Sequence, residues 1–226
     1  MIKPHALFLF ALVFSALGSR ADLILIQQAS DTNGTHAANL RIHGDKLRME
    51  EANSSMVVII DMKTRDSFTL LTTNQTFLHR FGSEIRWQMA EEKKFTHGTN
   101  DIDFPPARPA DTGKSEVVNG RPAEIYVWSG AQGLTETLWV DKNSPNYAAI
   151  QPELAKLDVF NDAGPHRNGQ PAMSQLPGLV LRSESTLKGH TITNILVSVK
   201  LEPVDASLFE LPPGYSPWKR PAAPKP

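Results

Sequence analysis

Apolar and polar residues alternate along much of the chain from residue 22 onward, which is the pattern of strands with one buried face. Leu40 and Ile42 alternate with polar residues, and Leu47 and Met49 do the same after the Gly-Asp pair at 44–45. A glycine in the first central position of a two-residue turn supplies the positive φ of a type II′ turn. The pattern predicts an antiparallel hairpin whose strands are residues 38–43 and 46–50.

Further runs of β-branched, aliphatic and aromatic residues recur every 8 to 12 residues, separated by Gly, Asn, Asp or Pro. Such spacing is typical of a sandwich or a barrel. In the last run, Ile195, Val197, Val199 and Leu201 are predicted to share one face. The count comes to about eleven strands, at residues 23–28, 38–43, 46–50, 56–61, 67–72, 75–80, 114–118, 122–129, 134–141, 179–187 and 190–200.

Two segments follow a helical period instead. Residues 83–94 predict a short amphipathic helix, with serine at its start and two lysines at its end. Residues 147–160 place apolar side chains at helical spacing after Ser144, a predicted N-cap. Pro152 interrupts this run, so two short helices are expected in place of one long helix. Residues 98–113 and 164–178 contain three prolines each and are predicted to be long loops.

The N-terminus has the pattern of a secretory signal peptide. Lys3 precedes twelve almost uninterrupted apolar residues, and small residues occupy positions −3 and −1 before Asp22. The apolar run is too short to cross a bilayer. The sequence therefore predicts a signal peptide at 1–21, a single domain at 22–216 and a disordered Pro-rich tail at 217–226. We expect an exported, periplasmic or secreted protein with no transmembrane segment after cleavage.

The charges are nearly balanced, with 23 Lys and Arg against 24 Asp and Glu. No basic field is available for binding nucleic acid, so nucleic acid is not an expected partner. The chain has no Cys, which excludes thiol catalysis and thiolate metal sites. No common catalytic or nucleotide-binding motif occurs, and the histidines show no metal-ligand spacing. No cofactor, no metal and no enzyme activity are predicted.

One hairpin is apolar on both faces. In residues 122–129, Ile125 shares a face with two other apolar residues, while Tyr126 and Trp128 occupy the opposite face. In residues 134–141, Leu138 and Trp139 likewise point to opposite sides. Two explanations remain open: loops or the helix at 147–160 cover the second face as ordinary core, or that face forms a cavity wall suited to an amphiphile.

The order of these pieces resembles a known family. The stretch LRIHGDKLR at 40–48, the VIID strand at 58–61, ETLWV at 136–140 and the closing DASLFELPPGY at 205–215 are similar to the bacterial domain-of-unknown-function family 4412. That family in turn resembles the LolA-like lipoprotein carrier and localisation proteins. The resemblance implies a mainly β fold, an incomplete antiparallel β-barrel of about eleven strands, with two or three short helices against its concave face.

The leading hypothesis is an exported, non-catalytic protein that holds a hydrophobic or amphipathic ligand, a lipid or an acylated peptide, in this half-barrel. An alternative is a structural or protein-interaction module of the cell envelope that uses a free edge strand or the loop at 98–113. A third is an enzyme, for which Glu136 is the candidate because it shares a face with Leu138 and should have a raised pKa. The predicted ligand-facing residues are Trp87, Met89, Trp139, Tyr147, Leu154 and Phe160.

Overall fold

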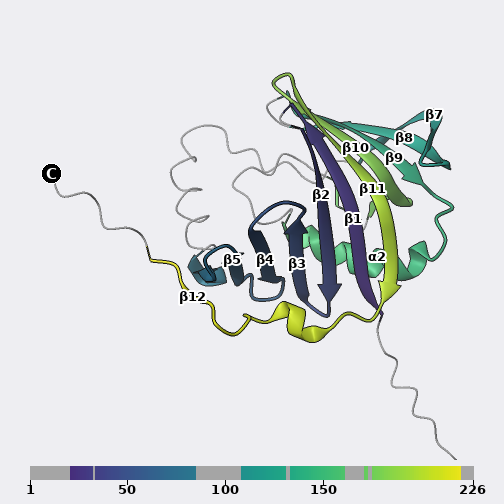
Figure 1. Ribbon diagram of the computed structural model, residues 1–226. Helices are drawn as coiled ribbons and strands as arrows, with labels where there is room; N and C mark the ends of the chain where they lie inside the picture. The colour runs from purple at the N-terminus through teal and green to yellow at the C-terminus, as the bar shows by residue number, and fades with distance from the viewer. Residues whose placement is uncertain are drawn as a thin grey trace, which may run out of the picture.

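The strands form one continuous sheet in the computed structural model, which describes residues 21–32, 34–84, 108–130, 133–160, 171–172 and 175–219. Within these residues the sheet has twelve strands in the order β12-β6-β5-β4-β3-β2-β1-β11-β10-β9-β8-β7. It curves strongly without closing, which confirms the predicted mainly β, incomplete barrel (Figure 1). The strands are β1 Asp22–Asp31, β2 Gly34–His43, β3 Lys46–Glu51, β4 Met56–Asp61, β5 Ser67–Leu71, β6 Thr76–Arg80, β7 Ala110–Val118, β8 Arg121–Ser129, β9 Thr135–Asp141, β10 Leu179–Leu187, β11 His190–Glu202 and β12 Ser216–Pro217.

The connectivity consists of two antiparallel meanders joined in the middle of the sheet. β1 to β6 follow one another in order, and β7 to β11 do the same. β1 lies between its sequence neighbour β2 and the last long strand, β11, with Asp22 opposite Glu202. β12 adds a parallel strand beside β6, at the border between the predicted domain and tail. Residues 220–226 of the tail, and the signal peptide except Ala21, lie outside the described residues.

The turns follow the predicted chemistry. Gly44 has φ 57°, and the hairpin that it closes pairs Ile42 with Leu47 as expected. Asn119 and Gly120 both have positive φ, which a type I′ turn requires. The strand before this turn, β7, begins at Ala110, four residues earlier than predicted.

One predicted face is wrong. The sequence places Val197 on one face with Val199 and Leu201, but Val197 is 57% exposed, while Leu196 is buried in the core. The register explains the change, because Ile26 lies opposite Ser198 and Gln27 opposite Leu196, so β11 carries an extra residue there. Such a bulge moves the alternation by one position, and a single strand's sequence does not reveal it.

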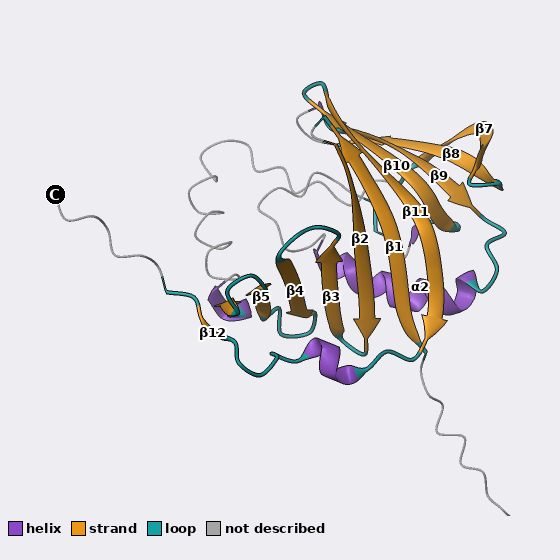
Figure 2. Ribbon diagram, in the orientation of Figure 1, coloured by secondary structure: helices purple, strands orange, loops and turns teal. Residues whose placement is uncertain are grey.

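Helix α2, Tyr147–Ala155, and the 3₁₀ helix η2, Lys156–Phe160, lie across one face of the sheet (Figure 2). The predicted break into two helices is found, but it falls after Ala155, and Pro152 is inside α2. Ala148, whose carbonyl loses its usual helical partner to the proline, is exposed, so water can bond that carbonyl. The N-cap is Asn146 in a left-handed conformation; the Ser144 hydroxyl accepts a hydrogen bond from Arg121 instead. Of the other predicted helix, residues 85–94 lie outside the described residues.

The core is divided between the two faces of the sheet. The main cluster packs β1, β2, β3 and β11 against Ile150, Leu154 and Leu157 of the helices. A separate cluster lies on β4 and β5, where Val57 and Ile59 contact Phe209 from the 3₁₀ helix η4, Ala206–Phe209. Ile60 packs in the main cluster, so β4 is covered on both faces, as its run of consecutive apolar residues indicates.

Candidate functional site

A cavity of about 390 Å³ lies between the sheet and the helices α2 and η2. Small-molecule pockets typically measure about 300–1,000 Å³, so this cavity has the size of a ligand site. Its wall is built from β1, β2, β9, β10 and β11, from both helices, and from the loop that precedes β10. Nine leucines line it: Leu25, Leu40, Leu138, Leu154, Leu157, Leu176, Leu179, Leu181 and Leu196.

Polar side chains also line the cavity, and they come from neighbouring strands. Glu136 of β9 lies opposite Ser185 of β10, and Ser183 of β10 lies opposite Asn194 of β11. Gln27 of β1 completes the set. We call these five residues the polar stripe. Because they share one wall with nine leucines, the cavity offers an apolar volume and a polar region, which matches the two parts of an amphiphile.

Glu136 is the acid of the polar stripe. The Trp128 indole Nε1 donates to its Oε2 at 2.6 Å, and the Ser185 hydroxyl donates to its Oε1 at 3.1 Å. Burial raises the pKa of the Glu136 carboxyl, and the two hydrogen bonds lower it by less. The raised pKa expected from the sequence is therefore found, and its cause is desolvation.

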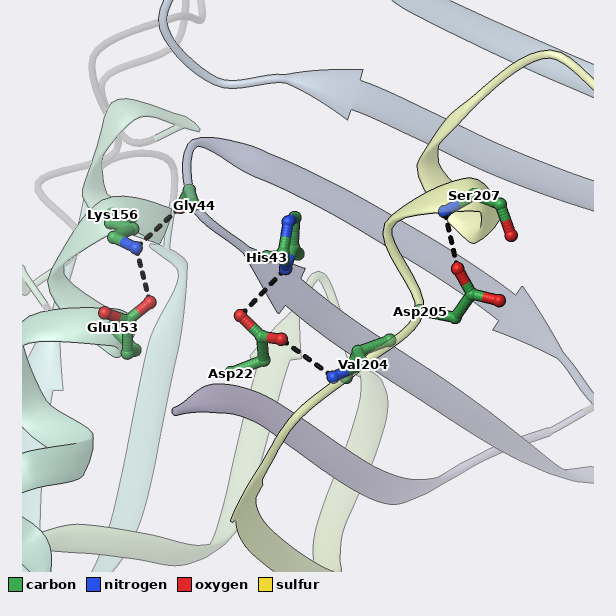
Figure 3. Close-up of polar contacts among 8 residues, drawn as sticks. All are labelled: Asp22, His43, Gly44, Glu153, Lys156, Val204, Asp205 and Ser207. Atoms are coloured by element: carbon green, nitrogen blue, oxygen red, sulfur yellow. Dashed lines mark hydrogen bonds and ion pairs between the residues drawn. The ribbon is translucent and has the colours of Figure 1, made fainter. Parts of the chain in front are cut away.

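The helices that cover the cavity are tied to the sheet by polar contacts at the position of Lys156 (Figure 3). The Lys156 ammonium donates to the carbonyl of Gly44 at 2.6 Å and pairs with the Glu153 carboxylate. Glu153 is only 4% exposed. At the start of α2, the Tyr147 hydroxyl donates to the carbonyl of Leu176 at 3.0 Å. These contacts fix both ends of α2 over the cavity.

Figure 3 also shows how the ends of the central strands β1 and β2 are joined to the segment that follows β11. The buried Asp22 carboxylate bonds the His43 ring at 3.0 Å and accepts from the backbone N–H of Val204 at 2.8 Å. The His43 ring stacks on Phe209. The first residue of β1 thereby anchors the segment that leads to η4, which covers the opposite face of the sheet from α2.

The predicted ligand-facing residues fall into three groups: some line the cavity, one is packed in the core, and the others lie outside the part that the structure describes. Tyr147 and Leu154 line the cavity. Trp139 is packed in the main core, with its indole Nε1 donating to Glu116 at 2.7 Å and the Arg182 guanidinium 4.3 Å from its ring centre. Trp87 and Met89 lie outside the described residues, and so does the side chain of Phe160.

Sequence reasoning missed four members of the polar stripe: Gln27, Ser183, Ser185 and Asn194. Each is an ordinary polar residue in a strand, and only the pairing of β1, β9, β10 and β11 brings them to one wall. Glu136 could be found because its own strand carries Leu138 on the same face. No comparable local signal marks the other four.

The hairpin with two apolar faces, β8 and β9, is covered on both sides. Tyr126, Trp128 and Leu138 form a cluster with Leu176 from the loop before β10, while Trp139 belongs to the main core. The explanation by ordinary core therefore accounts for Tyr126 and Trp128. The cavity begins beside them, at Glu136 and Leu138.

The described ranges contain neither a metal-ligand cluster nor a membrane-spanning helix. In them, no group of three His, Cys, Asp or Glu side chains is placed to hold a metal ion. No helix in this part of the chain is both long and apolar enough to span a bilayer.

The family model for a domain of unknown function, DUF4412, matches residues 23–215. The chain belongs to this family. The match covers all the strands described above except β12 and the first residue of β1, and it confirms the resemblance seen in the sequence. A comparison with curated proteins found no match.

Solved structures with a similar fold share little sequence with this DUF4412 protein. An uncharacterized conserved protein from Thermus thermophilus is 9% identical, with a TM-score of 0.51, over 89% of this chain and 92% of that one. A LolA superfamily protein from Nitrosomonas europaea is 8% identical, with a TM-score of 0.30, over 84% and 89%. PNGF-II is 16% identical, with a TM-score of 0.37, over 84% of this chain, which spans only 30% of PNGF-II. Of the three, the similarity to the Thermus thermophilus protein concerns the fold.

Proposed function

We propose that this DUF4412 protein binds a hydrophobic or amphipathic ligand, a lipid or an acylated peptide, and does not catalyse its conversion. The observation that carries the proposal is the leucine-lined cavity with the polar stripe in its wall. The apolar chain of the ligand occupies the leucine-lined volume, and its polar end lies against Glu136 and Ser185. Tyr147 and Leu154, both predicted from the sequence, contact the ligand.

The proposal includes export. The predicted cleavage falls immediately before Asp22, which begins β1 and whose carboxylate is buried against His43 and Val204. The first described strand begins at the residue that follows the predicted cleavage site, and this agreement supports the proposal that residues 1–21 are removed. The intact mass of the protein recovered from the cell envelope of its host tests this point, and a mass that retains residues 1–21 contradicts it.

Ligand binding is tested by titrating the mature protein with a fluorescent fatty acyl probe while Trp emission is followed. Leu196→Trp places a large side chain in the cavity and should reduce probe affinity at least about tenfold, or about 1.4 kcal/mol. Val197→Trp is the matched control, because Val197 is next to Leu196 in the sequence but is 57% exposed and does not line the cavity. Leu154→Trp fills the cavity from the helix side and serves if Leu196→Trp fails to fold.

Equal probe affinity in the wild type and both cavity-filling variants would contradict binding at this site. An absence of probe binding, together with native mass spectrometry showing empty protein from the host, would contradict the function as a whole. Native mass spectrometry also separates a lipid from an acylated peptide by mass.

A second candidate is a protein-interaction module of the cell envelope. β7 is an edge strand among the described residues, and all of its residues except Val118 are exposed. It also has features that discourage pairing with another chain, including charged side chains and an irregular register between Asp111 and Ser115. Crosslinking in the envelope distinguishes the candidates, since a stable partner attached through β7 and an empty cavity would favour the module.

A further inference from the structure

The chemistry of the polar stripe bears on which amphiphile the cavity accepts. Among the residues that line the cavity, two carry a formal charge, Glu136 and Arg182. The Arg182 guanidinium lies over the Trp139 ring and pairs with Glu184 through Nη2, while its buried Nε has no hydrogen-bond partner among the described residues. Glu136 is the one acid among the described lining residues, so it is the group that can pair with a cationic end of a ligand.

The Glu136 carboxylate has neutral partners only. Its hydrogen bonds come from the indole of Trp128 and the hydroxyl of Ser185. Across the described part of the chain, no Lys, Arg or His nitrogen forms an ion pair with it. A carboxylate has about four acceptor positions, and these two donors use two of them. A half-buried anion with acceptor positions left over is stabilised by a compact cation with several donors.

We propose that the cavity selects amphiphiles whose polar end is a protonated primary amine, with Glu136 as the counter-charge. The inference rests on the proposed function and makes it specific. An ammonium group brings three donors and a localised charge to the carboxylate. A hydroxyl of the same chain length brings one donor without charge, and a carboxylate or phosphate end is repelled. The cavity should therefore rank amine above alcohol above carboxylate.

The other groups around Glu136 do not supply this charge. Trp128 of β8 and Ser185 of β10 are neutral donors. The Tyr147 phenol, on α2, donates to Leu176, and burial raises its pKa, so it stays neutral across the physiological range. Glu124 and Lys142, near Tyr126, pair with each other. The amine preference should accordingly depend on ionisation of Glu136 and fade as the pH falls through its pKa.

The experiment compares three probes with the same chain, dodecylamine, dodecanol and dodecanoate, by calorimetry below their aggregation concentrations. The wild type should bind the amine at least about tenfold more tightly than the alcohol, a difference of about 1.4 kcal/mol. Glu136→Gln should remove this preference, so that its affinities for dodecylamine and dodecanol differ by less than about twofold. Glu202→Gln is the matched control, because this carboxylate at the end of β11 is exposed and does not line the cavity.

The outcomes separate the two proposals. If dodecanol binds and the amine is not preferred, or if Glu136→Gln keeps the preference, the amine selectivity is wrong while the ligand-binding function stands. If none of the probes binds, both are wrong. Loss of the amine preference in the wild type at low pH gives the same information without a substitution, should Glu136→Gln fail to fold.

Discussion

Replacing Lys156 by Met should destabilise the protein substantially, because this side chain joins the helical layer to the sheet. The substitution keeps the aliphatic part of the side chain and removes the ammonium. Two acceptors lose the Lys156 ammonium: the Glu153 carboxylate, which is almost fully buried, and the carbonyl of Gly44 in the turn between β2 and β3. The perturbation therefore tests a contact between α2 and the strands that line the cavity.

The size of the effect follows from burial. Removing one partner of a buried ion pair costs about 3–5 kcal/mol. The Lys156 side chain is 15% exposed, which places the expected loss at the lower end, about 3 kcal/mol. For a domain of this size, each kcal/mol lowers Tm by about 2–4 °C, so a decrease of about 6–12 °C is expected.

Urea and thermal unfolding, followed by Trp fluorescence, measure this loss. Lys63→Met is the control, because Lys63 is exposed in a turn and the same charge is removed there. In Glu153→Gln/Lys156→Met the acceptor charge is gone as well, so the double variant should be more stable than the sum of the single losses predicts. A Lys156→Met variant as stable as Lys63→Met would refute the assignment of Lys156 as the tie between the two layers.

Three further predictions concern other sites. Glu136→Gln should be more stable than the wild type at about pH 7. The pKa of Glu136 is raised in the folded state, so the wild type loses stability as the pH rises from about 4.5 through the folded-state pKa. Urea unfolding midpoints measured at several pH values should show the difference in stability vanish at about pH 4. Glu50→Gln should behave oppositely. Burial raises the pKa of Glu50, but the hydrogen bonds and charges of Arg41 and Arg48 lower it by more, so the net pKa is lowered. The wild type should therefore be the more stable protein above about pH 4.5 and lose that advantage in acid. Gly178→Ala should cost about 1–3 kcal/mol in thermal unfolding, because its Cβ would overlap the Asp141 carbonyl and lie 2.7 Å from the Cα of Lys142; a loss below about 0.5 kcal/mol would contradict this packing.

Most strands could be predicted from the sequence because their signals are local. The bounds of β4 and β10 agree with the prediction at both ends, since alternation or an apolar run defines each strand and turn residues flank it. The features that were missed depend on partners distant in sequence. The bulge at Val197 exists only relative to β1, and β12 exists only because residues 216–217 lie beside β6. The N-cap is Asn146 and not Ser144, and the Ser144 hydroxyl accepts a hydrogen bond from Arg121 of β8, a contact that the local sequence does not reveal.

The candidate site divides in the same way. Glu136 could be identified because an acid between Leu134 and Leu138 breaks the pattern of its own strand. Ser185 and Asn194 could not, because serine and asparagine are common in strands and their position in the cavity wall depends on the order of β9, β10, β11 and β1. Trp139 shows the converse limit, since a large aromatic side chain near the cavity is used for core packing against Arg182 and Glu116.

The central position of β1 has a consequence for how the chain reaches this fold. Of the described strands, β1 is the first to be synthesised, yet one of its two neighbours, β11, is the last long one. The contact order of this pairing is therefore high, and folding should be slow. Until β11 arrives, β1 presents an unpaired edge at the end of the first meander, a surface prone to intermolecular aggregation. A chain truncated before β11 should precipitate, whereas a holding chaperone that covers residues 22–31 during synthesis should raise the yield of native protein.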